Sequence, residues 1–76
     1  MTSQDYINWA NEYQQEAESV ENVINRKKQE LESENRSFEK MMLCKTLKRL
    51  EGQKLLCLNT ARLLESRARV IREKEG

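Results

Sequence analysis

The hydrophobic positions in the C-terminal half of the chain recur at alternating steps of four and three residues. This spacing is the a/d pattern of a heptad repeat, which places every member on one side of a helix. One charged residue, Lys54, interrupts the pattern. The pattern therefore predicts a helix that pairs along a C-terminal seam, whose hydrophobic members are Leu43, Leu47, Leu50, Cys57, Ala61, Leu64, Ala68 and Ile71.

A weaker repeat of the same kind runs through the N-terminal half, where Lys27 and Glu34 occupy two of the expected hydrophobic positions. Thr2 and Asp5 have the spacing of a capping box, so a helix is expected to begin beside them. The N-terminal seam consists of Tyr6, Ala10, Tyr13, Ala17, Val20, Ile24, Leu31 and Phe38. The two seams together predict an all-α protein built from one long, nearly continuous helix in a coiled coil or helical bundle.

The two halves carry opposite charge, which bears on how the helices pair. Residues 1–39 hold nine acids and four bases, a net charge of −5, and residues 40–76 hold four acids and ten bases, a net charge of +6. Parallel pairing would place like charges together, whereas antiparallel pairing places the acidic half along the basic half. We treat the halves as one structural unit and expect an antiparallel homodimer.

A register in which paired residue numbers sum to 81 matches several large side chains with small ones, such as Leu64 with Ala17. Its flaw is a Lys27–Lys54 layer. A shift by one heptad places Val20 against Lys54, which is no better. A hairpin in the first register would have to turn within residues 38–43, which lack Gly, Pro and Asn, so we prefer two long helices. The alternative is a hairpin that turns near residues 33–37, the most polar run of the chain.

Two sets of candidate binding residues follow from these patterns. The residues expected to pair the helices are Tyr13, Ala17, Val20, Ile24, Leu31, Phe38, Leu43, Leu47, Leu50, Cys57, Ala61, Leu64, Ala68 and Ile71. A second hydrophobic row, spaced by sevens, lies beside the C-terminal seam, and aromatic residues share one face near the N-terminus. The side chains that could dock a partner are Tyr6, Trp9, Leu56, Leu63 and Val70, although aromatic stripes more often belong to a core.

Composition narrows the class of protein. The chain of 76 residues is 36% charged, has a mean hydropathy of −0.95 and contains no Pro, which is typical of long helices. Without a run of about 18 apolar residues, no transmembrane helix is expected. The acidic, polar N-terminus is unlike a signal peptide. We interpret Cys44 and Cys57 as reduced thiols of an intracellular, cytoplasmic or nuclear, protein.

Catalysis is not expected, because the chain lacks histidine and a concave pocket is hard to form from one helix. Two thiols are too few for a zinc site, and no cofactor is implied. The expected function is that of an assembly module that dimerises and docks a further helical protein. Nucleic-acid binding by the basic half is the alternative, weakened by interspersed acids, by the absence of aromatic residues there and by an overall net charge of only +1.

Overall fold

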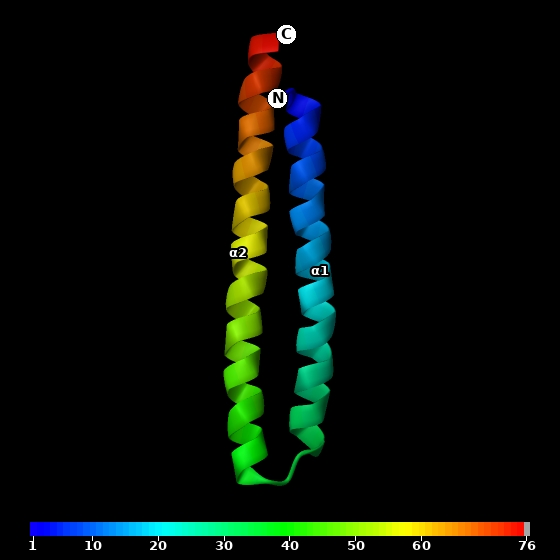
Figure 1. Ribbon diagram of the computed structural model, residues 1–76, viewed down its shortest axis with the longest axis vertical. Helices are drawn as coiled ribbons and strands as arrows, with labels where there is room; N and C mark the ends of the chain where they lie inside the picture. The colour runs from blue at the N-terminus through cyan, green and yellow to red at the C-terminus, as the bar shows by residue number, and fades with distance from the viewer. Residues whose placement is uncertain (76) are drawn as a thin grey trace.

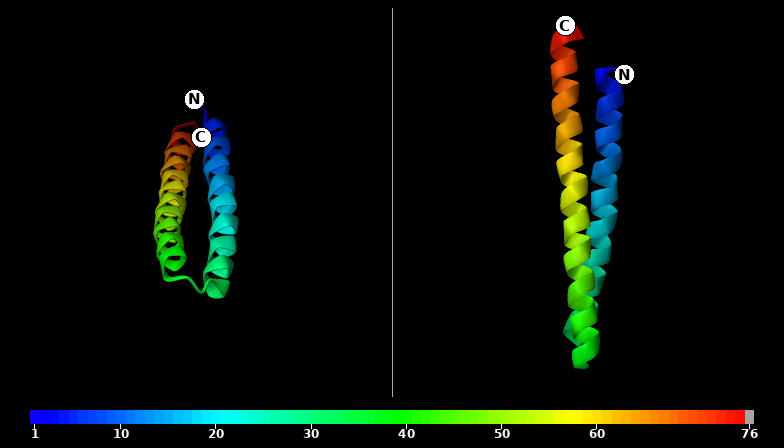
Figure 2. Two further views of the ribbon diagram at one scale, coloured as in Figure 1. Left: turned by 60° about the horizontal axis from the view of Figure 1, so that its bottom comes forward. Right: turned by 60° about the vertical axis from the view of Figure 1, so that its left-hand side comes forward.

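The protein is an antiparallel helical hairpin in the computed structural model, which describes residues 1–75 (Figure 1). Helix α1 spans Ser3–Ser33, helix α2 spans Ser37–Glu75, and no strand occurs in this part of the chain. The hairpin measures 59 × 14 × 14 Å, and the left-hand view in Figure 2 shows the helices side by side along their length. Predictions of an all-α fold and of antiparallel helices are confirmed.

The capping box predicted at the start of the chain begins α1. The backbone N–H of Asp5 donates to Thr2 Oγ1 at 3.3 Å, and the backbone N–H of Thr2 donates to Asp5 Oδ2 at 2.9 Å. These two bonds satisfy donors that have no partner within the helix. The hydrogen bond from the Thr2 backbone N–H, supported by the Thr2 side chain, lowers the pKa of the Asp5 carboxyl, because it favours the ionised form.

The prediction of one nearly continuous helix was wrong, because the chain turns at residues 34–36. This turn lies within residues 33–37, where the alternative prediction of a hairpin placed it. Glu34 leaves the helical conformation at φ −86° and ψ 129°, and no residue of the turn has a positive φ. Its carboxylate accepts the backbone N–H of Asn35 at 3.0 Å and the backbone N–H of Arg36 at 2.9 Å. The Glu34 side chain thus satisfies the backbone donors of a turn that contains neither Gly nor Pro.

An ion pair adds to this turn. Arg36 Nε donates to Glu34 Oε1 at 3.1 Å, so one carboxylate binds both the backbone and the side chain of Arg36. Hydrogen bonds from Arg36 lower the pKa of the Glu34 carboxyl, and the same contact raises the pKa of Arg36. The first backbone bond of α2 runs from Lys40 N–H to the Arg36 carbonyl, which places the start of α2 directly after this ion pair.

The buried side chains form two clusters between the helices. Ala10 packs with Ala61 and Leu64, joined by Tyr6 and Tyr13, and a second cluster contains Val20, Ile24 and Leu47, joined by Leu31 and Leu50. The expected register, with residue numbers that sum to 81, is therefore wrong, since it placed Leu64 opposite Ala17. The paired residues now sum to about 74, as for Ala10 with Leu64, because the turn at 34–36 lies earlier than that register required.

Phe38 was also misassigned as a helix-pairing residue. It lies in the first turn of α2 and its side chain is 64% exposed. In the new register it has no opposite residue on α1, because its counterpart would fall in the turn itself.

We predict that two adjacent leucines differ sharply in their effect on stability. Leu64→Ala should lower the free energy of unfolding by about 2–5 kcal/mol, because Leu64 is 9% exposed and packs in a core cluster. Leu63→Ala, at a side chain that is 68% exposed, should change it by less than about 0.5 kcal/mol. Urea unfolding followed by circular dichroism measures both, and equal losses would mean that the buried face of α2 is misassigned.

We also predict that Glu34→Ala opens the hairpin. Without the carboxylate the turn loses its acceptor for two backbone N–H groups, and Ala favours helix through residues 34–36. Continuous helices from two chains would then pair antiparallel with the same contacts, as in a domain-swapped dimer. Sedimentation equilibrium should show more dimer for Glu34→Ala than for the unchanged chain. The control is Glu32→Ala, at an exposed acid of α1 outside the turn, which should behave like the unchanged chain.

Candidate helix-docking surface

Most residues predicted to pair helices do so within this single chain. All of them except Phe38 are buried or half-buried between α1 and α2. The buried and half-buried members are Tyr13, Ala17, Val20, Ile24, Leu31, Leu43, Leu47, Leu50, Cys57, Ala61, Leu64, Ala68 and Ile71. The hairpin therefore fills the seam that the sequence analysis assigned to a homodimer, and any docking surface has to lie elsewhere on the molecule.

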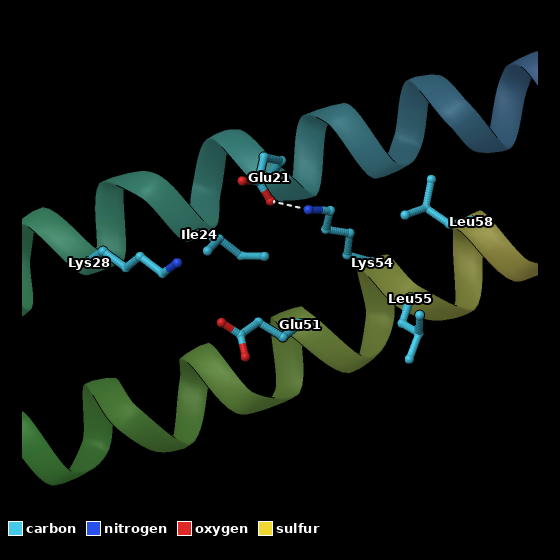
Figure 3. Close-up of a pocket in the computed structure, with 7 residues that line it drawn as sticks. All are labelled: Glu21, Ile24, Lys28, Glu51, Lys54, Leu55 and Leu58. Atoms are coloured by element: carbon cyan, nitrogen blue, oxygen red, sulfur yellow. Dashed lines mark hydrogen bonds and ion pairs between the residues drawn. The ribbon is translucent and has the colours of Figure 1, made fainter.

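Lys54, the charged residue in the C-terminal seam, is paired with an acid across the helices. Its Nζ lies 2.6 Å from Glu21 Oε2, with both side chains partly exposed (Figure 3). This hydrogen bond, supported by the charge of Lys54, lowers the pKa of the Glu21 carboxyl. The sequence analysis did not select Glu21 as a partner of Lys54. Glu21 comes within reach of Lys54 only in the observed register, in which Lys54 lies opposite Val20, the residue before Glu21.

An open groove of about 370 Å³ surrounds this ion pair and forms one edge of the hairpin. Figure 3 shows Lys28 on α1 and Glu51 on α2 facing the groove from opposite sides, with Leu55 and Leu58 farther along α2. Acids and bases of both helices meet here. The groove is thus a solvated edge where the two oppositely charged helices adjoin, rather than an enclosed site for a small molecule.

The aromatic residues near the N-terminus divide into core and rim. Tyr6 and Tyr13 are half-buried and pack against the cluster of Ala10, Ala61 and Leu64. Trp9 lies between them, with its ring centroid 6.5 Å from each tyrosine ring, and is 42% exposed. The interpretation of the stripe as core is confirmed for the two tyrosines, and Trp9 stays a candidate for contact with a partner.

The second hydrophobic row on α2 is unpaired in the hairpin. Leu56, Leu63 and Val70, which we call the outer row, are 66%, 68% and 49% exposed. The last two line a shallow hollow with Ser66 and Arg67. Further hydrophobic side chains that the sequence analysis did not select are also exposed on α2, namely Met41, Met42 and Leu55.

The charged residues that flank the outer row are nearly all basic. On the helix surface, each member of the outer row is flanked by the residue one position before it and by the residues three and four positions after it. These flanking residues and the row itself lie on the side of α2 away from the seam. Between residues 55 and 74 these positions contain one acid, Glu73, and four exposed bases. The bases are Arg62, Arg67, Arg69 and Lys74.

The acids in the middle of α2 lie on its other side, near α1. Glu65 accepts a hydrogen bond from Gln14 of α1, and Glu51 lines the groove beside Lys54. Positive charge is therefore concentrated around the outer row, although the whole chain is almost neutral.

The two cysteines have different environments. Cys57 is buried in the seam, and burial, with a smaller contribution from the charge of Glu16, raises the pKa of its thiol. Cys44 is exposed. The raised pKa disfavours the reactive thiolate at Cys57, which behaves as a small hydrophobic side chain.

Comparison of the chain with protein family models, curated proteins and solved structures finds no match. Within residues 1–75, neither helix contains a segment long and apolar enough to cross a membrane. No three acids or thiols in the same part of the chain are grouped so that they could hold a metal ion.

We predict that acid weakens the hairpin through the Glu21–Lys54 pair. Because folding lowers the pKa of Glu21 from its ordinary value of 4.5, the stabilisation is present above that value and is lost as the pH falls through the lowered pKa. Glu21→Gln should reduce the melting temperature by a few degrees at neutral pH, and this difference should vanish in strong acid. Glu12→Gln, at an exposed acid that forms no ion pair within residues 1–75, is the control and should show no such difference.

Proposed function

We propose that this protein is a non-enzymatic assembly module, a helical hairpin that docks a helix of another protein within an intracellular multiprotein complex. The observation that carries the proposal is the outer row, whose three hydrophobic side chains are between 49% and 68% exposed. They lie on a helix that is already paired along its other side. Contiguous exposed hydrophobic residues typically mark surfaces that bind other macromolecules.

The outer row is not required for the hairpin. Leu64 and its neighbours in the seam supply the contacts between α1 and α2, whereas Leu56 and Leu63 contribute little buried surface. A helix that is hydrophobic on two sides is expected to be buried on both. The hairpin supplies one of these contacts, and a partner helix would supply the other.

The antiparallel homodimer stays a prediction, and the hairpin changes the form that it would take. Since the seam is filled within one chain, two copies can pair along it only by exchanging helices across residues 34–36. The docking activity does not depend on such an exchange, because the outer row is exposed in the single hairpin. The free thiols Cys44 and Cys57 fit a reducing, intracellular compartment.

Nucleic-acid binding is supported by one observation, the four bases around the outer row. Phosphate neutralisation accounts for bases but leaves Leu56, Leu63 and Val70 exposed to water or to phosphates. A partner helix accounts for both the hydrophobic row and its flanking charges, so we favour a protein partner.

A photo-cross-linking amino acid placed in living cells tests the proposed function. At position 63 it should form adducts with a defined protein through a helical segment of that protein, and the adduct should form again from the purified components. The same amino acid at position 15, an exposed glutamine on α1, should give no such adduct. Equal labelling from both positions, or adducts with nucleic acid only, would contradict a docking role for the outer row.

A further inference from the structure

We propose that the outer row receives an acidic amphipathic helix from a different protein, packed side chain into hole as in a coiled coil. The inference rests on the proposed function and deepens it by assigning the chemistry of the partner. The partner helix would carry hydrophobic residues at heptad spacing, flanked by Glu or Asp.

The first support is the shape of the hollow on α2. Its lining residues are Leu63, Ser66, Arg67 and Val70, which stand at positions i, i+3, i+4 and i+7. Four residues with this spacing form the hole that accepts one side chain of a facing helix in knobs-into-holes packing. One heptad earlier, Leu56, Asn59, Thr60 and Leu63 repeat the same spacing with comparable residue types.

The spacing of the outer row supports a helical occupant. Residues seven apart on a straight helix drift by about 20° per heptad, so a row held strictly at sevens stays aligned with a second helix that supercoils around the first. Small or short polar residues, Gly52, Asn59 and Ser66, alternate with the large members of the row. A Cβ added at Gly52 would meet nothing within 4 Å, so the hairpin leaves room for a partner side chain there.

The flanking charges specify an acidic partner. Arg62 and Arg69 border the row on one side, and Arg67 and Lys74 border it on the other, all of them exposed. Residues at these flanking positions face the corresponding positions of a paired helix and set the choice of partner. A helix with acids there would be attracted along both borders, and a basic helix would be repelled.

The same charges argue against a second copy of this chain. Two α2 helices in parallel would bring Arg62 close to Arg67 of the second copy, and two antiparallel α2 helices would bring the two Arg62 side chains together. The acidic α1 of a second copy is no better suited. Its outward positions at sevens are Asn8, Gln15, Asn22 and Gln29, which offer no hydrophobic row to cover that of α2.

A membrane surface fits the row less well than a helix does. The hydrophobic strip is interrupted on one side by Asn59 and Ser66, and no Trp or Phe borders Leu56, Leu63 or Val70. Helices that lie on membranes generally present a broad hydrophobic face with such aromatic residues.

Synthetic peptides test the proposal with the full-length chain. The acidic peptide has four heptads with Leu at a and d and Glu at both flanking positions, and a matched peptide has Lys in place of Glu. Fluorescence anisotropy should give a dissociation constant at least tenfold lower for the acidic peptide, with the difference shrinking at high salt. The acidic peptide should also gain helix on binding, as read by circular dichroism.

Variants of the hairpin localise the effect. Leu63→Ala should weaken binding of the acidic peptide at least tenfold without changing the melting temperature of the hairpin. Phe38→Ala removes a larger side chain that is 64% exposed but lies in the first turn of α2, far from Leu63 along the helix, and should weaken binding less than threefold. The double variant Arg62→Glu with Arg69→Glu should reverse the preference between the two peptides.

Several outcomes would overturn the inference. Equal affinity for both peptides would contradict the acidic partner. Equal losses from Leu63→Ala and Phe38→Ala would contradict the position of the docking surface. A dimer of the chain alone that dissociates with Leu63→Ala would make a second copy the occupant. Binding to anionic vesicles or duplex DNA without binding to the acidic peptide would assign the face to those ligands. If both peptides fail while cross-links at position 63 identify a protein, the proposed function stands and only the acidic partner is wrong.

Discussion

The position of the turn at residues 34–36 determines which surfaces of this protein are buried and which are exposed. A turn at this position fixes the axial register of α2 against α1, and the register decides which side chains meet. It brings Leu64 to Ala10 and places Lys54 within reach of Glu21. The turn itself depends on the carboxylate of Glu34, which binds two backbone N–H groups and the guanidinium of Arg36.

A two-helix hairpin buries one side of each helix and exposes the rest, so the exposed faces of α1 and α2 can be compared with each other. The outer face of α1 is lined with Asn, Gln and Glu, as expected for a helix whose only contact is α2. The outer face of α2 instead carries Leu56, Leu63 and Val70 between basic residues. The asymmetry supports the proposal that α2, rather than α1, docks a partner. Gly52 belongs to the same contrast, because nothing inside the hairpin requires a residue without a side chain there.

The sequence was sufficient to predict the helices, the capping box at Thr2, the antiparallel arrangement and nearly all the buried seam, because each depends on local spacing or on net charge. The turn was harder to place, since residues 34–36 contain neither Gly nor Pro and only the structure shows the side chain that satisfies the backbone. The exposure of the outer row agrees with its place beside the seam, although sequence alone did not separate it from Trp9 or select Leu55.

The register could not be obtained from hydrophobic spacing, because a heptad repeat looks nearly the same after a shift of seven residues. Lys54 distinguishes the two registers. In the register summing to 81 it faces Lys27, whereas in the observed one it lies beside Val20, and its ammonium group reaches Glu21 on the adjoining edge of α1. A charged residue in a hydrophobic seam commonly lowers stability while it specifies alignment. The bases around Leu56, Leu63 and Val70 lie on the side of α2 away from α1 in either register, because a shift of seven residues leaves each residue on nearly the same side of the helix.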